Sequence, residues 1–417
     1  MKILIVSQYY WPEDFAAGVY IRELAEALVV RGHEVTVLTA FPHYPEGHVW
    51  PPYRGRMYLR EEKGGVQIIR TYIFAVPRDR PLRVRVLTHL SFALSASLVL
   101  PWLEGHDVCY VHMPVLPLGF VSVAACSIRG TACVLGVKDL SAEALVQSGK
   151  VSRGGVSHLV EKLEHLLYSL ADRIQVPGPD YKRRLKGWGI REDSISVVPD
   201  WADADFVRPM PKENEFRRSH QLEGKFVVLY SGNMGFSSDL ETVLLAAREV
   251  GGDEGIRFVF IGDGVMRESL LRKAADLRLE NVRFLPFQAR TLFPEALAAA
   301  DVCLVTLNRN FTGVAAQGKM YNIMAAGRPV LAVMDEEACG ADMIRREDVG
   351  RIVQPGDAEG LARIIADWRR RPEECEAYGR RARLVLESRF TVERCTEMFE
   401  EVFKAATRSY ASDGKGV

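Results

Sequence analysis

Residues 2–40 are KILIVSQYYWPEDFAAGVYIRELAEALVVRGHEVTVLTA, and this stretch decides the fold. Its uncharged ILIV run predicts a strand that is buried on both faces of a parallel sheet. Leu24 and Leu28 recur at helical spacing, and Gly32 ends the predicted helix before a second strand at residues 34–40. A strand, a helix and a strand in this order indicate a parallel βαβ unit.

The same alternation runs through both halves of the chain. It restarts in the second half with the apolar segments FVVLYSG, RFVFIGDG, VRFLPF and DVCLVTL. A break falls in SVVPDWADADFVRP, residues 196–209, where two prolines and several acidic or small residues separate the halves. The sequence therefore predicts an α/β protein with two doubly wound domains, in which ligands bind at the carboxyl ends of the strands.

The composition is that of a globular protein of 417 residues, which is long enough for two domains. It has 54 basic and 54 acidic side chains, and this balance argues against a general nucleic-acid binder. Seven cysteines are scattered with no Cys-x-x-Cys pair. We therefore expect reduced thiols in a cytosolic protein, with neither a zinc site nor disulfides.

One uncharged run, VLTHLSFALSASLVLPWL at residues 86–103, raises the question of a membrane. It directly follows four arginines, Arg78, Arg80, Arg83 and Arg85. Three interpretations stay open: a membrane-spanning helix, a buried helix of an α/β domain, and a helix in a membrane surface with its arginines on anionic headgroups. The apolar run that opens the chain is too short for a signal peptide, so a cytoplasmic location is expected.

Two loops after predicted strands are candidate phosphate sites. In LYSGNMG, residues 229–235, Gly232 and Gly235 lie between a strand and a helix, where backbone N–H groups can approach an anion. Such a turn also serves merely to pack a helix on a sheet. No Gly-x-Gly-x-x-Gly fingerprint is complete, so a nicotinamide enzyme is not expected.

The second loop lies in FTGVAAQGKMYNIMAAGRPVLAV, residues 311–333, and runs into a short predicted helix from Lys319 to Ala326 that Gly327 ends. The N–H groups at the start of this helix and Lys319 would suit a diphosphate, and Asn322 could hydrogen-bond ribose hydroxyls. A crossover helix with an ordinary cap explains the same pattern, so both interpretations remain open.

Further segments carry a family resemblance. FPHYPEG continues the amino-terminal stretch, VKDLSAEA follows in the first half, and YSGNMG, FIGDG, NVRFLPFQ and GKMYNIMAAGRPVLAV follow in the second. QPGDAEGLARII and a helix around TVERCTEMFEEVF close the chain. In this order the segments resemble family 4 glycosyltransferases with the GT-B fold, nearest to those of bacterial exopolysaccharide, colanic acid and O-antigen synthesis, fucosamine transferases included. The resemblance covers nearly the whole chain.

The resemblance implies two Rossmann-like doubly wound domains that face each other across a cleft. Residues 1–200 would be the acceptor-side domain, 201–385 the nucleotide-sugar domain, and 386–417 a helix crossing back to the first domain. It also implies transfer of a sugar, UDP-linked by analogy, to a lipid-linked saccharide with retention at the anomeric carbon. The protein would work on the inner membrane face through Arg78–Leu103, with no metal and no cofactor besides the donor.

The resemblance also assigns roles to residues. The base would lie against residues 287–288, the diphosphate against the turns at 232–235 and 316–319, and the ribose against Asn322. The predicted catalytic residues are Gly18, Lys138 and Asp139. The predicted donor-binding residues are Gly232, Asn233, Gly235, Phe287, Gln288, Gln317, Gly318, Lys319 and Asn322.

Five positions depart from the family pattern. Val314 and Asn322 stand where many members have two glutamates, and Asn233 and Ser238 stand where many have an arginine and a lysine. Lys138 replaces a histidine that often precedes the acidic residue of the first domain. These losses keep a weakened enzyme, or a non-catalytic homologue that binds a partner transferase, open as alternatives. A sugar-nucleotide 2-epimerase of the same architecture is a further alternative.

Other polar residues near these motifs have weaker signals. His33 occupies a helix-to-strand turn and is expected to be structural. His43 and His48 lie in the His-Tyr-Pro loop without a metal-ligand set, and could contact an acceptor. Glu13 and Asp14 adjoin a proline, and we expect surface turn residues there rather than acceptor-binding acids.

Overall fold

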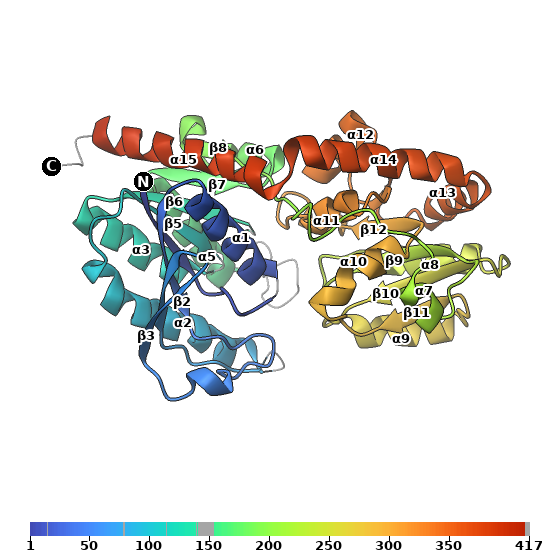
Figure 1. The fold of residues 1–417 in the computed structure, drawn as a ribbon, viewed down its shortest axis with the longest axis horizontal. Coiled ribbons are helices and arrows are strands. Elements are labelled where there is room, and N and C mark those ends of the chain that lie inside the picture. Colours follow the sequence, from blue (N-terminus) through green and yellow to red (C-terminus); the bar gives the residue numbers. More distant parts are fainter. Residues whose placement is uncertain (15, 78–79, 114, 139, 141–153, 413–417) are drawn as a thin grey trace. The chain divides into compact units, whose positions relative to one another are not determined.

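The computed structural model describes residues 1–14, 16–77, 80–113, 115–138, 140 and 154–412. The chain separates into two compact units (Figure 1). Unit 1 comprises the described parts of residues 1–143 and 151–198 together with residues 395–412, and unit 2 comprises residues 199–394. Each unit is a largely parallel sheet between helices, so the predicted class, α/β with two doubly wound domains, is confirmed.

Unit 1 has an eight-stranded sheet in the order β3-β4-β2-β1-β5-β6-β7-β8. All neighbouring strands are parallel except β3 and β4, which pair antiparallel at one edge. The strands are β1 (Lys2–Ser7), β2 (Glu34–Ala40), β3 (Tyr58–Lys63), β4 (Val66–Thr71), β5 (Val108–Met113), β6 (Ala132–Val137), β7 (Arg173–Val176) and β8 (Ile195–Val197).

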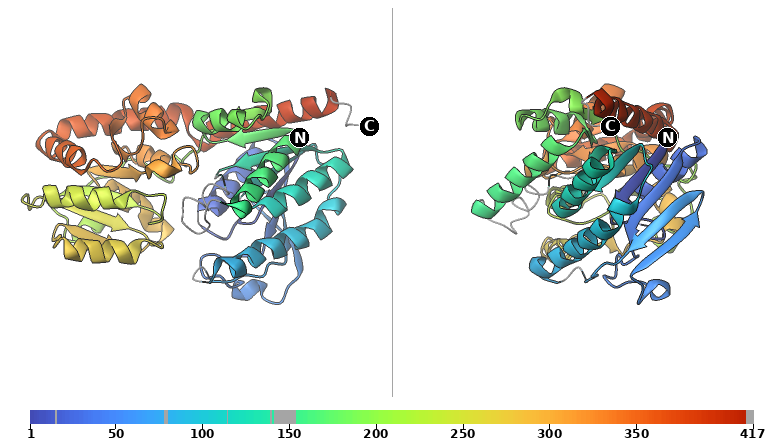
Figure 2. Two further views of the ribbon diagram at one scale, coloured as in Figure 1. Left: turned by 180° about the vertical axis from the view of Figure 1, so that it is seen from behind. Right: turned by 90° about the vertical axis from the view of Figure 1, so that its left-hand side faces the viewer.

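Helices cover both faces of this sheet. The helices α2 (Leu82–Val99), α3 (Leu116–Arg129) and α5 (Gly155–Leu170) lie side by side on one face (Figure 2). Tyr110 in β5 faces the opposite side from its neighbour Cys109, which contacts Cys126 of α3. The remaining helices of this unit are α1 (Ala16–Val30), α6 (Pro179–Gly187), α15 (Val392–Ser412) and the short η1 (Pro51–Tyr53), η2 (Leu100–Trp102) and η3 (Glu192–Ser194).

The last helix, α15, packs on unit 1. The ring of Tyr110 lies 5.3 Å from that of Phe399 and 5.9 Å from that of Phe403. Glu400 accepts hydrogen bonds from Arg31, and its Oε1 lies 2.8 Å from Nε2 of His33. The structural role predicted for His33 is thereby confirmed, because this turn anchors the end of the chain.

The predicted end of the first helix is also confirmed. Helix α1 ends at Val30, and Gly32 follows with φ of 86°, a conformation that favours glycine. The amide of Gly32 donates to the carbonyl of Val29 (2.9 Å), and that of His33 donates to the carbonyl of Leu28 (3.1 Å). These bonds satisfy carbonyls of the last turn and turn the chain into β2.

Unit 2 has a six-stranded, fully parallel sheet in the order β11-β10-β9-β12-β13-β14. Its strands are β9 (Phe226–Ser231), β10 (Ile256–Ile261), β11 (Val282–Leu285), β12 (Val302–Thr306), β13 (Val330–Val333) and β14 (Gly350–Val353). Its helices are α7 (Glu215–Ser219), α8 (Leu240–Glu249), α9 (Arg267–Asp276), α10 (Phe293–Ala298), α11 (Lys319–Ala325), α12 (Cys339–Glu347), α13 (Ala358–Arg370), α14 (Pro372–Arg389), η4 (Arg290–Leu292) and η5 (Arg309–Phe311).

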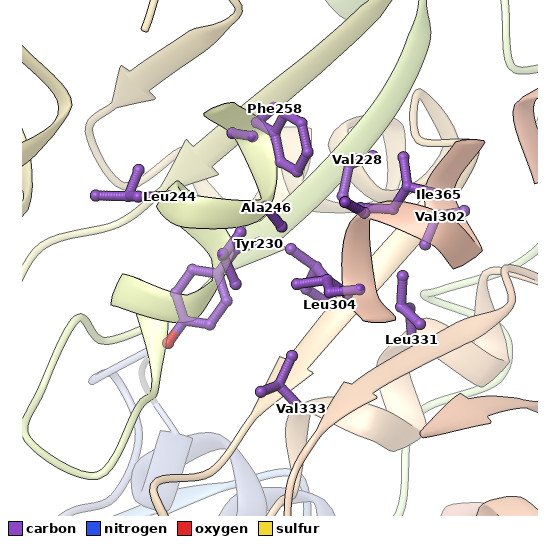
Figure 3. Close-up of a cluster of buried hydrophobic side chains, with 14 of the residues drawn as sticks. Val228, Tyr230, Leu244, Ala246, Phe258, Val302, Leu304, Leu331, Val333 and Ile365 are labelled. Carbon is purple, nitrogen blue, oxygen red and sulfur yellow. The ribbon is translucent and has the colours of Figure 1, made fainter. Parts of the chain in front are cut away.

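The main core of unit 2 lies between this sheet and the helices α8 and α13. Figure 3 shows Val228 of β9 beside Ile365 of α13, and Leu304 of β12 and Leu244 of α8 belong to the same cluster of buried residues. Leu229 and Val305 alternate with the core residues of β9 and β12 and are also buried. Because both faces of the sheet are covered, ligand access is left to the loops at the ends of the strands.

Candidate active site

Glycine turns follow β9 and β10 at the carboxyl edge of the unit 2 sheet. Gly232 has φ of 143°, and Gly262 and Gly264 have φ of 143° and 152°, which L side chains rarely adopt. A Cβ on Gly262 would lie 2.0 Å from the carbonyl oxygen of Gly232, and one on Gly264 would lie 2.4 Å from that of Met234. The two loops therefore pack backbone against backbone, which explains the YSGNMG and FIGDG motifs.

A hydrogen-bonded hub lies at this turn, formed by Tyr230, Asn233, Ser238 and Lys319. The ammonium of Lys319 donates to the phenol oxygen of Tyr230 (2.8 Å). It also lies 4.0 Å from the centre of the tyrosine ring and 2.9 Å from where a Cβ on Gly232 would stand. The phenol donates to the carbonyl of Asn233 (2.7 Å) and lies 3.0 Å from Oγ of Ser238. Tyr230 is fully buried, so it fixes the ammonium above the glycine turn.

The hub includes Asn233 and Ser238, the two uncharged residues at positions where many family members have cations. Of these two residues, Ser238 contacts Tyr230 through its side chain, whereas Asn233 accepts from Tyr230 through its main-chain carbonyl. The phenol has one proton and gives it to Asn233, so the hydroxyl of Ser238 is the donor in the contact with Tyr230. The positive charge at this turn therefore comes from Lys319. Sequence reasoning missed Tyr230, although a tyrosine ending an apolar strand beside the motif was a signal.

The second loop brings Lys319 to this turn from the start of α11. Gly318 precedes the helix, and a Cβ there would lie 2.8 Å from Oδ2 of Asp200. Asn322 lies one turn further and is half-buried, and no described residue hydrogen-bonds its side-chain amide. Val314 is buried, so an apolar side chain fills the position where many members have a glutamate. The helix ends at Ala325, one residue before the predicted end.

The other predicted donor residues show fewer contacts. Phe287 and Gln288 follow β11 at the same edge of the sheet, and the ring of Phe287 is 47% exposed. Gln288 donates to the carbonyl of Pro286 (2.9 Å), and Gln317 donates to the carbonyl of Ala315 (3.1 Å). Within the described residues, no hydrogen bond joins these side chains to the hub. The structure thus brings Gly232, Asn233 and Lys319 together, and leaves the base-binding role of residues 287–288 a prediction.

The predicted catalytic residues belong to unit 1. Gly18 is buried in the first turn of α1, where a Cβ would lie 2.4 Å from the carbonyl oxygen of Glu13. Lys138 follows β6, and its ammonium lies 3.8 Å from the centre of the Tyr20 ring. The hydroxyl of Tyr181 donates to the carbonyl of Lys138 (2.9 Å). Asp139 lies outside the described residues.

A histidine that sequence reasoning missed lies close to Lys138. His112 is in the penultimate position of β5, 6% exposed, and its Nδ1 has no hydrogen-bond partner among the described atoms. Burial, with a smaller effect of the charge on Lys138, lowers the pKa of His112 to about 3. The imidazole is therefore neutral at physiological pH. A polar residue at the carboxyl end of a buried strand, VCYVHM, was the signal.

The expectation for Glu13 is wrong, because this residue is 2% exposed rather than on the surface. Its Oε1 accepts hydrogen bonds from the amides of His43 and Tyr44, each at 2.8 Å. Burial raises the pKa of Glu13 to about 7 against the opposing effect of these amides. Asp14 does lie on the surface, where it pairs with Arg22 at 2.9 Å. The carboxyl of Glu13 therefore joins the loops that follow β1 and β2.

Among the described residues, no three His, Cys, Asp or Glu side chains are grouped so that they could hold a metal ion. A metal-independent reaction stays a prediction.

Two family models match the chain. A glycosyl transferase 4-like domain matches residues 15–201, and a glycosyl transferases group 1 domain matches residues 212–385. Between them the models span most of both units, and the chain is a glycosyltransferase of the GT-B type. Within that class it belongs to family 4, so the predicted family and the prediction of a transferase enzyme are confirmed.

Two bacterial glycosyltransferases are similar to this chain in sequence. The chain is 29% identical over 338 residues to the putative colanic acid biosynthesis glycosyl transferase WcaI of Escherichia coli (strain K12), covering 78% of this chain and 82% of the relative. It is 33% identical over 237 residues to the probable glycosyltransferase WbjE of Pseudomonas aeruginosa, covering 56% of this chain and 58% of the relative.

Solved structures share the fold. Sucrose-phosphate synthase from Thermosynechococcus elongatus matches with a TM-score of 0.75 and 17% identity, over 97% of this chain and 98% of the other. Anabaena HepE in complex with UDP matches with a TM-score of 0.72 and 17% identity, over 97% and 100%. At these identities the likeness establishes the GT-B fold alone.

Proposed function

We propose that this enzyme transfers a sugar from a UDP-linked donor to a lipid-linked saccharide acceptor in the synthesis of a cell-surface polysaccharide. The observation that carries the proposal is the ammonium of Lys319, held by Tyr230 above the glycine turn after β9. A fold relative supports the donor class, because Anabaena HepE was solved with UDP and with UDP-glucose. The likeness to WcaI supports the polysaccharide context.

The chemistry of the hub suits a departing diphosphate. When the bond from the anomeric carbon to the phosphate oxygen breaks, negative charge grows on the diphosphate. A fixed ammonium at Lys319 and the backbone N–H groups of the glycine turn would stabilise that charge without reorganising. Asn322 lies on the same helix, its side-chain amide bonds no described residue, and it would bond ribose hydroxyls. Residues 287–288 would contact the base.

Retention follows if the acceptor hydroxyl attacks from the face that the diphosphate leaves. Its proton would pass to the departing phosphate oxygen, so no strong protein base is required. Gly18 would bring its N–H towards the phosphates, and Lys138 and Asp139 would act at the sugar. The configuration of the product anomeric carbon, measured by NMR with an α-linked donor, tests this step, and an inverted product would refute it.

The donor proposal is tested by thermal shift with UDP, GDP, ADP and dTDP. A nucleotide at about 100 times its dissociation constant should stabilise the protein by about 2.7 kcal/mol. Lys319→Met should weaken UDP binding about 10- to 100-fold, because a charge-assisted bond is worth about 1.5–3 kcal/mol. Lys273→Met is the control, since Lys273 is ion-paired with Glu241 on the surface of the same unit.

Four outcomes would contradict the proposal. No shift with any nucleotide would remove the donor site, and equal loss in both lysine variants would remove the role of Lys319. Tight UDP binding without turnover would favour the non-catalytic homologue. Release of a free epimerised sugar without an acceptor would favour the 2-epimerase.

We further propose that the enzyme binds the inner membrane surface through α2. One helix, Arg83–Trp102, is long and apolar enough to cross a membrane by length and composition alone, with 28% of its apolar window buried. Leu87, Leu90, Leu94 and Leu98 form one face of this helix and are 42–69% exposed. The opposite face, which includes Phe92 and Ala96, is buried against unit 1.

This arrangement fits a helix lying in the headgroup region, because only one face is apolar and free. Arg80 and Arg83 are exposed at its amino-terminal end, where they suit anionic lipids, and Arg78 lies outside the described residues. Flotation with anionic vesicles should be lost in the double variant Leu94→Gln/Leu98→Gln. The control is Leu384→Gln, since Leu384 is equally exposed on unit 2. Flotation unchanged in the double variant would refute the proposal.

A further inference from the structure

Three polar side chains form a hydrogen-bonded chain at the carboxyl edge of the unit 1 sheet. Gln8 directly follows β1, His43 lies in the loop after β2, and His89 belongs to α2. Nδ1 of His43 lies 2.9 Å from the carbonyl oxygen of Phe41, and Nε2 of His43 lies 3.4 Å from Nε2 of Gln8. Oε1 of Gln8 lies 2.7 Å from Nδ1 of His89. We call this set the glutamine relay.

The direction of every bond in the glutamine relay is fixed from one end. The carbonyl of Phe41 only accepts, so Nδ1 of His43 carries the proton and Nε2 of the neutral ring is an acceptor. Oε1 of Glu13 lies 3.5 Å from the same Nδ1 and already accepts two backbone amides, so the proton of the acid form belongs on Oε2 and Oε1 has none to donate to His43. The amide group of Gln8 must therefore donate to His43, which turns its oxygen towards His89.

The relay ends at a bare nitrogen. Because the oxygen of Gln8 only accepts, Nδ1 of His89 carries the proton and Nε2 of the neutral ring is left as a lone pair. Burial, then the charge of Arg85, lowers the pKa of His89 to about 4, so the ring is neutral at physiological pH. Gln8 and His43 are buried, whereas His89 is only partly buried, and no described group bonds its Nε2.

The unprotonated Nε2 of His89 determines by its hydrogen-bonding character which ligands it can bind. A hydrogen-bond acceptor without charge binds a neutral donor such as a hydroxyl, and it repels phosphate and carboxylate oxygens. The carbonyl of Phe41 sets the polarity of the relay, because reversing every bond would keep the inner pairs but leave the lone pair of Nδ1 of His43 facing a carbonyl oxygen. A tautomer imposed through three side chains is stronger support for a ligand contact than an isolated surface histidine.

We propose that Nε2 of His89 accepts a hydrogen bond from a hydroxyl group of the saccharide acceptor, and that the glutamine relay holds the histidine in the tautomer that makes this contact. The assignment rests on the proposed glycosyl transfer, since it names the acceptor side of that reaction. His89 contacts substrate in this proposal, whereas Gln8 and His43 are positioning residues.

The first test reads the tautomer directly. In protein with 15N-labelled histidine, the ring nitrogens of His89 are assigned by the signals that His89→Gln removes, and nitrogen shifts distinguish a bare from a protonated ring nitrogen. We expect a protonated Nδ1 and a bare Nε2 in His89. A protonated Nε2 would overturn the proposal.

The second test adds a ligand of the expected chemistry. The methyl glycosides of glucose, galactose and mannose, at high millimolar concentration, are the probes because they present the common hexose hydroxyl arrangements. At least one should shift the Nε2 signal of His89, and its affinity should fall about tenfold in His89→Ala and less in His89→Gln, whose amide oxygen can still accept. No shift with any of the three would overturn the proposal.

Two controls separate this proposal from its foundation and from folding. Gln8→Leu breaks the relay without touching Nε2, and should give His89 a mixture of tautomers and weaker glycoside binding. Both His89→Ala and Gln8→Leu should keep the thermal shift with UDP, because the donor site belongs to unit 2. If UDP gives no thermal shift in the wild-type protein, the proposed donor site is refuted. The role of His89 is then judged by the NMR measurement of its tautomer.

Discussion

The buried carboxyl of Glu13 makes the stability of unit 1 depend on pH. Burial raises its pKa from 4.5 to about 7, so between these pH values the folded protein holds a proton that the unfolded chain has lost. Stability therefore falls as the pH rises through this window. The difference of about 2.5 pH units, at about 1.36 kcal/mol each, sets an upper figure of about 3 kcal/mol.

Glu13→Gln removes the titration while keeping an oxygen for the amides of His43 and Tyr44. The free energy of unfolding of the variant, relative to wild type, should rise by up to about 3 kcal/mol from about pH 4.5 to about pH 8. Calorimetric melts over a pH series, with the transition of unit 1 followed separately, measure this difference. Asp14→Asn is the control, because it removes the neighbouring carboxylate from an exposed position.

Two results would refute the reasoning. A difference between Glu13→Gln and wild type that stays constant with pH would mean that the two amides cancel the effect of burial. An equal pH-dependent gain in Asp14→Asn would assign the effect to the charge of the loop rather than to the burial of Glu13.

Three other changes have expected outcomes. Tyr230→Phe should weaken UDP binding about fivefold in calorimetric titration, because Lys319 loses a hydrogen bond worth about 1 kcal/mol. The melting temperature of ligand-free unit 2 should change little. Gly262→Ala should destabilise unit 2 by more than about 2 kcal/mol in urea unfolding, because its Cβ would stand 2.0 Å from a carbonyl oxygen in a strained conformation. Glu400→Gln should lower the free energy of unfolding of unit 1 by about 2 kcal/mol at neutral pH, because hydrogen bonds from Arg31 lower the pKa of Glu400 to about 2. The stabilisation by the Glu400 carboxylate is complete above about pH 4.5 and is lost as the pH falls through about 2. Acid unfolding of the variant and the wild type measures this difference.

Much of the fold follows from local patterns in the sequence. The uncharged ILIV run, the helical spacing of Leu24 and Leu28, and Gly32 as a stop predicted β1, α1 and the turn into β2, because each signal acts over a few residues. The edge pairing of β3 with β4 and the packing of Tyr110 on Phe399 have no such signal. They depend on contacts between distant segments, which a periodicity does not encode.

The site divides in the same way. Gly232 and Lys319 were predicted from motifs, and the structure brings them together. Tyr230 and Glu13 were missed or misjudged, because their roles depend on burial. A tyrosine in an apolar strand suggests packing, and a carboxylate beside a proline suggests solvent. Only the folded loops show that each group is enclosed and hydrogen-bonded.

The docking of α15 has a consequence for the order in which the protein is made. Unit 1 is discontinuous, since residues 395–412 complete it only after the whole of unit 2 has left the ribosome. Until then the ring of Tyr110 lacks its partners on α15, and Arg31 lacks Glu400. The described part of unit 2 runs without interruption from residue 199 to residue 394 and can fold on its own contacts first. The half of the enzyme that is synthesised first is therefore the half that is finished last.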